Sequence, residues 1–234
     1  MKHSGKAKNI LRLLLVKIPL AFVAITFLWV LLLKWVPVYY TPLMAIRSIE
    51  YRSDDKFHTY KSWQPLENIS PSLAMAVMAG EDNRFLEHHG FDFVELKKAL
   101  KEKKSGKRVR GASTISQQTA KNVFLWPGKS LFRKGLEAYF TLLIELVWGK
   151  ERIMEVYLNV AEMGKGIYGA EAAAERLFQT RASKLGKYQS SLIAASLPNP
   201  IKRRADLPTS YHKKRASDIR RLMNNLQTPE WLKR

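Results

Sequence analysis

The chain is 234 residues long and contains no cysteine. It can therefore form no disulfide and no Cys-based metal site, and it has no thiolate with which to attack a substrate. Its five histidines include no HExxH pair, so a zinc-protease motif is missing too. These absences exclude several classes of enzyme. They are compatible with an oxidising compartment but do not place the protein there.

Acidic residues are scarce, with 20 Asp and Glu against 40 Lys and Arg, which leaves a net charge of +20. Such an excess suggests an anionic partner, namely lipid headgroups, nucleic acid or a phosphorylated substrate. The basic residues gather in residues 97–110, 202–204 and 213–215. Each stretch is either a solvated face or a surface that attracts anionic headgroups, worth about 1 kcal/mol per Lys or Arg near a membrane.

Long apolar runs are also few, and the decisive one is near the N-terminus. Residues 18–33 carry no charge, and continuing past Lys34, which can snorkel, gives a predicted span of residues 18–36. At about 1.5 Å per residue this helix would reach roughly 29 Å, enough to cross a hydrocarbon core. Residues 1–17 are basic and lack acids, so the positive-inside rule places them in the cytoplasm and the following domain outside. A cleaved signal peptide is the alternative, but no small-x-small cleavage site follows.

The rest of the chain reads as one domain with an irregular entry. Residues 37–68 contain scattered prolines and charges and are predicted to form a stalk or linker, and residues 69–234 the domain. Apolar periodicity and good helix formers predict a mainly α fold. The expected helices are residues 71–80, 91–103, 114–124, 131–148, 150–160, 167–178, 183–196 and 208–226.

Two adjacent acids, Glu81 and Asp82, follow the apolar residues 71–79, where a helix should end. A phenylalanine, two histidines and another acid come within the next ten residues. So many acid and base groups beside apolar surface are typical of a catalytic cleft. A solvated loop with ordinary acids would have the same sequence pattern.

Two further segments contain more polar residues than packing requires. Thr114 and Gln117 can close a capping box, which leaves Gln118, Lys121 and Asn122 unexplained. Amides and a cation on one helix face suit sugar hydroxyls and a phosphate. Glu137 lies in a helix that is apolar on nearly every side. Its nearest candidate partners are Arg133 and Lys134, and it is either a helix ion pair or a catalytic acid. Residues 150–170 look mainly structural.

These segments together resemble the family 51 glycosyltransferases, which polymerise peptidoglycan. The resemblance covers about residues 60–200 and carries four motifs in the family's order: Glu81-Asp82-x-x-Phe85-x-x-His88-x-Gly90-x-Asp92; Gly111-Ala-Ser-Thr-Ile-Ser-Gln-Gln118 with Lys121-Asn122; Arg133-Lys134-x-x-Glu137; and Ile153-Met-Glu155-x-Tyr157-Leu158-Asn159 followed by Gly166-Ile-x-Gly-Ala170. The family pattern has Gly and Thr where this chain has Ala112 and Ser116. Both changes are small and look like the monofunctional branch, which has no transpeptidase domain.

The resemblance implies a lysozyme-like helical domain behind one N-terminal transmembrane helix. It implies that Glu81 is the base on a sugar hydroxyl, and that Glu137 holds cations or assists departure of the leaving group. Lys121, Arg133 and Lys134 would neutralise the leaving pyrophosphate. The other candidate substrate-binding residues are Asp82, Phe85, His88, Ser113, Thr114, Gln117, Gln118 and Asn122.

The implied donor is the growing glycan on undecaprenyl pyrophosphate, and the implied acceptor is lipid II. Transfer would invert the anomeric centre to a β-1,4 linkage. No tightly bound cofactor is expected, although Mg²⁺ or Mn²⁺ could accompany the pyrophosphate. Expected partners are membrane lipids at the cell inner membrane and, as a further option, cell-wall synthesis or division proteins. Nucleic acid is not expected, because the domain would lie outside the cytoplasm, in the periplasm.

Two other functions fit part of the same pattern. A lysozyme-like lytic enzyme or hydrolase would use Glu81 as an acid on peptidoglycan, but it would not need the cations between residues 121 and 134. A membrane-tethered scaffold would use only the basic surface, and it leaves Glu137 and the Gln-Gln-Lys cluster without a purpose.

Overall fold

The computed structural model describes residues 13–105, 111 and 113–233. It divides the chain into two compact units, one that ends at Val36 and one that begins at Pro37. Each unit is considered by itself. The basic N-terminal segment up to residue 12 and residues 106–110 of the predicted basic loop lie outside the described residues.

The first unit is one apolar helix. A π-helical turn, η1 (Leu13–Lys17), continues into α2 (Ile18–Leu32), and together they form a helix of 20 residues that is long and apolar enough to cross a membrane. The helix begins earlier and ends earlier than the predicted span of residues 18–36, since Leu33 to Val36 form a turn. Its length and composition are consistent with a single-pass membrane anchor.

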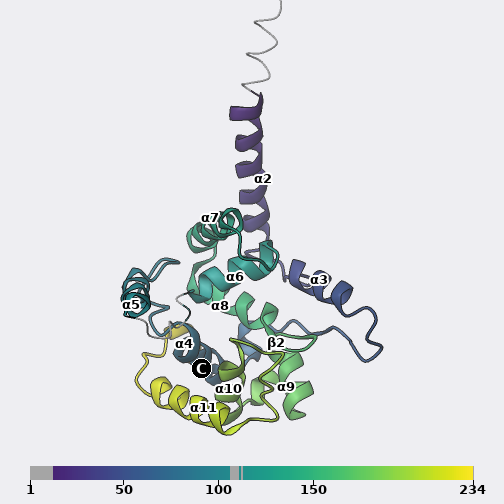
Figure 1. The fold of residues 1–234 in the computed structure, drawn as a ribbon, viewed down its shortest axis with the longest axis vertical. Helices are drawn as coiled ribbons and strands as arrows, with labels where there is room; N and C mark the ends of the chain where they lie inside the picture. The colour runs from purple at the N-terminus through teal and green to yellow at the C-terminus, as the bar shows by residue number, and fades with distance from the viewer. Residues whose placement is uncertain (1–12, 106–110, 112, 234) are drawn as a thin grey trace, which may run out of the picture. The chain divides into compact units, whose positions relative to one another are not determined.

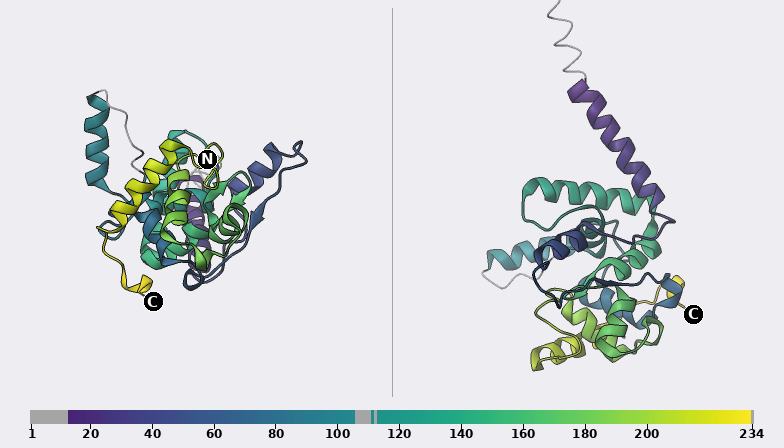
Figure 2. Two further views of the ribbon diagram at one scale, coloured as in Figure 1. Left: turned by 90° about the horizontal axis from the view of Figure 1, so that it is seen from below. Right: turned by 90° about the vertical axis from the view of Figure 1, so that its right-hand side faces the viewer.

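The second unit is mainly helical and lysozyme-like, as predicted. Two helical groups build it (Figures 1 and 2). In one, α4 (Pro71–Glu81) packs against α10 (Lys187–Ser196) and α11 (Ser210–Met223). In the other, α6 (Ile115–Phe124) packs against α7 (Leu131–Val147) and α8 (Gly149–Val160). The functional site lies where the end of α4 meets α6.

The unit also contains α5 (Phe93–Lys104), α9 (Ala170–Phe178) and the short helices η3 (Ala182–Lys184) and η4 (Glu230–Leu232). A small sheet has the order β1-β3-β2, made of β1 (Tyr60–Lys61), β2 (Glu162–Gly164) and β3 (Ile167–Tyr168). β1 is parallel to β3 and β2 is antiparallel to it. The prediction of a helix from residue 167 was therefore wrong at its start, because the first residues pair as a strand.

Residues 37–68 are not the irregular stalk that the prolines predicted. They contain α3 (Pro42–Glu50), β1 and the short helix η2 (Leu66–Asn68). Pro42 occupies the first turn of α3, where a missing N–H costs nothing, and the Thr41 side chain caps it by accepting from Met44 N. Asn159 of α8 also bonds both backbone groups of Gln64, at 2.8 and 2.7 Å. The segment thus belongs to the domain.

A glycine fixes the turn between β2 and β3. Gly166 has φ +71°, and a Cβ there would lie 2.2 Å from the carbonyl oxygen of His58. Only glycine fits such a backbone without strain. The close approach lets Tyr60 N donate to Gly166 O at 2.7 Å, which joins the entry segment to the sheet.

Lys61 is an unusual cation in this sheet. Its ammonium is buried without a hydrogen-bond partner among the described residues, and it lies over the rings of Tyr39 (5.8 Å) and Trp63 (5.3 Å). Burial lowers the pKa of Lys61 from 10.5 to about 8. The two cation–π contacts offset part of the desolvation cost but supply no hydrogen bond.

We expect Lys61→Met to stabilise the full-length protein at pH 7 by about 1 kcal/mol, after allowance for the partial exposure of the side chain. The pKa of Lys61 is lower in the folded protein than in the unfolded chain, so the unfolded chain binds more protons between pH 8 and 10.5. The free energy of unfolding of the wild type therefore rises over this pH range. Denaturant unfolding in detergent at pH 7 to 11 measures both profiles. The gap between wild type and variant should close as pH rises, and parallel profiles would contradict the assignment.

Candidate active site

Glu81 is the last residue of α4, and side chains from two other helices fix its carboxylate. Gln118 of α6 donates from Nε2 to Glu81 Oε2 at 2.9 Å. Tyr157 of α8 in turn donates its hydroxyl to Gln118 Oε1 at 3.2 Å. Burial raises the pKa of Tyr157 well above its usual range, and the Glu81 and Asp82 carboxylates add to this, so the phenol stays a neutral donor. These contacts, which run from Tyr157 on α8 through Gln118 on α6 to Glu81 on α4, orient the Glu81 carboxylate.

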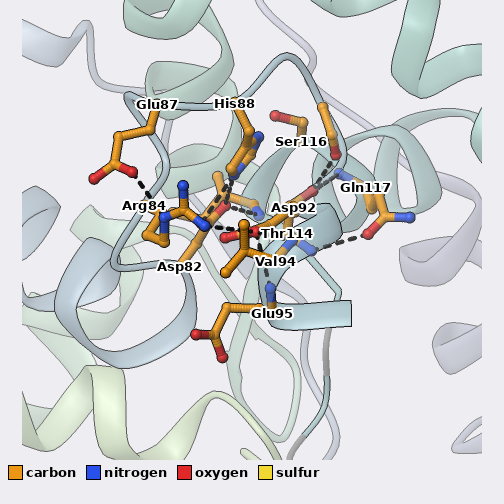
Figure 3. Close-up of polar contacts among 12 residues, drawn as sticks. Asp82, Arg84, Glu87, His88, Asp92, Val94, Glu95, Thr114, Ser116 and Gln117 are labelled. Carbon is orange, nitrogen blue, oxygen red and sulfur yellow. Dashed lines mark hydrogen bonds and ion pairs between the residues drawn. The ribbon is translucent and has the colours of Figure 1, made fainter. Parts of the chain in front are cut away.

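Asp82 connects the end of α4 to two neighbouring segments (Figure 3). Its two oxygens lie 3.0 and 3.1 Å from His88 Nε2, and Oδ2 also accepts from Ile115 N, in the first turn of α6, at 2.9 Å. Asp82 and His88 are 7% and 8% exposed, so these contacts are shielded from water. We call this set of contacts the Asp82 clamp. It holds the backbone directly beside Glu81.

Asp92, directly before α5, makes a further set of contacts close to the Asp82 clamp. Its Oδ1 accepts from Val94 N at 2.9 Å, Glu95 N at 3.0 Å and the Arg84 guanidinium at 3.1 Å. Asp82, His88 and Asp92 offer ligand atoms within 4.8 Å of one another, a spacing that could hold a metal ion. The Arg84 cation already bonds one oxygen of Asp92, whereas Asp92 Oδ2 and His88 Nδ1 are buried without a hydrogen-bond partner among the described residues. The contacts of this cluster connect the end of α4 to the starts of α5 and α6.

Several residues that were predicted to bind substrate use their side chains for contacts within the protein. Thr114 and Gln117 form the capping box of α6, and the Thr114 hydroxyl donates to Gly90 O at 2.6 Å. Phe85 is 1% exposed and lies under the Lys150 ammonium, 4.5 Å from its ring centroid. His88 faces Asp82, as described above. Each of these four residues makes contacts within the protein, and a direct contact with substrate remains a prediction for each of them.

α7 presents the predicted second acid with its two cations. Glu137 is 3% exposed, and it accepts from Arg133 Nη1 at 2.7 Å and from Lys134 Nζ at 2.5 Å. The prediction that these two residues are its partners is confirmed. Burial lowers the pKa of Lys121; the Glu137 carboxylate opposes this shift, and the Arg133 and Lys134 cations reinforce it. Three cations from α6 and α7 thus gather around one buried carboxylate.

Two hollows lie near Glu81. The larger cavity, about 320 Å³, is lined by Gln118, Lys121, Asn122 and Tyr157, among others. The smaller one, about 120 Å³, is lined by Glu81, Asp82, Asn83 and Ser113 together with residues of α5. Glu81 lines the smaller hollow, and Gln118, which bonds to the Glu81 carboxylate, lines the larger one.

Among the residues of the larger cavity that were not predicted as site residues, three have polar or charged groups of interest. Tyr157 reads as part of a buried apolar stripe, Arg47 lies in the segment taken for a linker, and Glu162 follows a helix that looks structural. The tyrosine is 1% exposed, so its place in a core stripe is correct as well. The signal in the sequence that could have pointed to Tyr157 is its place in the fourth motif, two residues before Asn159.

Comparison with known proteins identifies the family of the chain. The family model described as Transglycosylase matches residues 49–224, and the chain belongs to this family. Three similar proteins are named "Biosynthetic peptidoglycan transglycosylase". The one from Bacteroides thetaiotaomicron is 59% identical over 204 residues, which are 87% of this chain and 82% of the relative. Those from Bdellovibrio bacteriovorus and Caulobacter vibrioides are 55% and 51% identical, over 86% and 91% of this chain and 81% and 90% of the relatives.

The fold and the relatives define a glycosyltransferase of family 51. More particularly, it is a peptidoglycan transglycosylase, as the resemblance predicted. The roles of the single site residues remain predictions that rest on the geometry above.

We expect Asp82→Asn to lower the free energy of unfolding by about 1–3 kcal/mol, because the charge that holds His88 and Ile115 N is lost. Polymerisation should fall as well, since the backbone at Glu81 loses its anchor. Urea unfolding of the full-length protein and a glycan synthesis assay measure the two effects. The exposed Asp55→Asn is the matched control. Equal stability of the two variants would refute the clamp.

Proposed function

We propose that this protein polymerises glycan chains by transferring the growing, lipid-pyrophosphate-linked strand to the 4-hydroxyl of a sugar of lipid II. Undecaprenyl pyrophosphate is the leaving group, and the anomeric centre inverts to a β-1,4 linkage. One observation carries the proposal: Glu81 lines a small hollow, and its partner Gln118 lines a larger cavity together with Lys121, which lies near Arg133 and Lys134. A two-substrate transfer needs such an arrangement, with the acceptor on one side of the base and the donor on the other.

Glu81 acts as the general base in this proposal. A sugar hydroxyl is a poor acid, so its attack is aided by a carboxylate that removes the proton as the new bond forms. The bond from Gln118 holds one oxygen of the carboxylate, and the Asp82 clamp holds the backbone behind it. Both contacts fix the direction of the base before substrate arrives, which lowers the entropy cost of the transition state.

The cations serve the leaving group. A departing pyrophosphate gains negative charge and needs compensation more than it needs a proton. Lys121, Arg133 and Lys134 carry three positive charges against the single charge of Glu137, so the cluster keeps an excess of two. Fixed charges in a partly buried site stabilise developing charge more strongly than solvent does. Entry of the hydroxyl opposite this cluster would give inversion.

Both Glu137 oxygens are already bound by Arg133 and Lys134. We therefore propose that Mg²⁺ or Mn²⁺, where it takes part, enters with the pyrophosphate and takes its ligands from phosphate oxygens. Its chemistry would be additional neutralisation of the leaving group.

A lipid-linked substrate requires the site to lie near a bilayer. The apolar helix Leu13–Leu32 suits an anchor, and we propose the cell inner membrane with the N-terminus cytoplasmic and the domain periplasmic. Trp126, Leu131 and Phe132 are 44%, 91% and 72% exposed, and we propose that they contact the bilayer interface. Leu125, next to Trp126, is 3% exposed and is left out of this proposed contact.

A peptidoglycan hydrolase is the alternative that shares the fold. It would use Glu81 as an acid on a neutral glycan, for which the cations on α6 and α7 have no task. Incubation of the purified protein with lipid II on the one hand and with intact sacculi on the other separates the two activities. Release of soluble fragments from sacculi without synthesis from lipid II would reject the polymerase.

We expect Glu81→Gln to lower polymerisation by about 10²–10⁴-fold or more, because the amide retains the shape but cannot accept the proton. Glu137→Gln should also be severe. The assay measures incorporation of labelled lipid II by the full-length protein in detergent. Glu67→Gln, an exposed acid on η2, is the control. Wild-type rates in the Glu81 variant would disprove its assignment as the base.

EDTA tests the proposed route of the divalent ion. We expect chelation to slow polymerisation without lowering the melting temperature, since protein carboxylates do not hold the ion. Addition of Mg²⁺ or Mn²⁺ should restore the rate, with an apparent affinity that depends on the lipid II concentration. A drop in melting temperature on chelation would instead reveal a site built by the protein.

A further inference from the structure

The helix α11 carries the basic residues 213–215, which take no part in the proposed chemistry. The structure divides this stretch, because Lys213 and Lys214 are exposed whereas Arg215 is half-buried. α11 packs against α4 and α10 (Figure 1), and the Arg215 side chain bonds to α4. The three residues therefore do not form one charged surface, and Arg215 needs an explanation of its own.

The Arg215 guanidinium bonds to the last turn of α4. Its Nη2 donates to the carbonyl oxygen of Gly80 at 3.0 Å. Carbonyls in the last turn of a helix lack the N–H groups that a continuing helix would supply. Asp82 N satisfies Met78 O, and Arg215 satisfies Gly80 O. A cation suits this position, because the carbonyl end of a helix carries partial negative charge. Arg215 thus caps the helix whose last residue is Glu81.

Gly80 also lies directly against two helices. A Cβ at this position would lie 3.3 Å from Ile219 Cδ1 on α11 and 3.5 Å from Ala194 Cβ on α10. Ile219 and Arg215 are four residues apart, so they share one face of α11. This face therefore meets the residue before Glu81 in two ways, through an apolar contact and through a hydrogen bond.

Arg215 bonds to α4 outside the two hollows. It is not among the described residues that line either hollow, although Leu222 of the same helix lines the smaller one. Glu81 accepts from Gln118 of α6 at 2.9 Å. That distance depends on where the last turn of α4 lies, and the bond from Arg215 holds this turn against α11. The location favours a role in positioning Glu81 over a direct role in substrate binding.

We propose that Arg215 is a positioning residue, which fixes the last turn of α4 and so keeps the Glu81 carboxylate within reach of Gln118 and of the sugar hydroxyl. The inference rests on the proposed role of Glu81 as the general base. Without the guanidinium, the Gly80 carbonyl loses this partner and the end of α4 can shift. A displacement of about 1 Å at a reacting group can slow a reaction about 100-fold. Binding of lipid II would be retained.

The test compares Arg215→Met and Arg215→Lys with the wild type, as full-length proteins in detergent with labelled lipid II. Methionine keeps an apolar stem but has no donor, whereas lysine keeps a charged donor without the fork of the guanidinium. We expect Arg215→Met to lower kcat about 10–100-fold, with the KM for lipid II unchanged. Arg215→Lys should recover part of the loss, because its ammonium can still donate to the Gly80 carbonyl.

Arg220→Met is the matched control. Arg220 is another half-buried arginine of α11, and its Nη1 donates to Ser191 Oγ at 2.9 Å, which ties α11 to α10 rather than to α4. Each of the two Met variants loses a side-chain hydrogen bond of α11, so we expect similar drops in melting temperature. Only Arg215→Met should lower kcat. An equal fall in kcat in both variants would show that Arg215 merely stabilises the fold, and would overturn the proposal.

Two further results would also overturn it: a wild-type kcat in folded Arg215→Met, or a rise in KM that accounts for the whole loss of activity. If Arg215→Met does not fold, Arg215→Lys and Arg220→Lys provide the same comparison. Glu81→Gln is measured in parallel. Wild-type activity of that variant would reject the base itself, whereas an inactive Glu81→Gln beside a fully active Arg215→Met would reject the positioning role alone.

Discussion

The Asp82 clamp is the contact on which the site depends. Glu81 comes at the end of a helix, where backbone groups lose their internal partners and the chain tends to fray. Asp82 prevents this by joining the end of α4 to the first turn of α6 and to His88. Gln118 on that same α6 then bonds to Glu81. The helix that anchors the backbone therefore also supplies the amide that aims the side chain, so the two are fixed together.

A second constraint comes from charge. A buried carboxylate such as Glu137 is tolerated only with partners, and α7 supplies two of them within one turn. The acid keeps Arg133 and Lys134 close to each other despite their repulsion. Lys121 approaches from α6, and burial and like charges make its pKa lower than usual. The site therefore holds an excess of positive charge, which in the proposed reaction would stabilise the departing pyrophosphate.

The motifs allowed much of this to be predicted. The mainly α fold, the capping box of Thr114 and the pairing of Glu137 with α7 cations all follow from short-range spacing along helices. The helix α3 and the role of the Tyr157 hydroxyl could not be predicted from such spacing. β1 is only two residues long and exists because β3 accepts it, which no local pattern shows. The Tyr157 hydroxyl matters because Gln118 lies opposite, and that proximity arises only when α6 packs on α8.

The two cations on Glu137 differ in freedom. The Arg133 side chain is 8% exposed and its Nε is also bound to Gly128 O, whereas the Lys134 side chain is 49% exposed. A guanidinium so fixed acts as a stationary charge, and a lysine on its flexible stem acts as a detachable counterion. In the proposed reaction, Lys134 would follow the departing phosphate outward while Arg133 keeps Glu137 neutralised. Product release then need not strip the buried acid of its last partner.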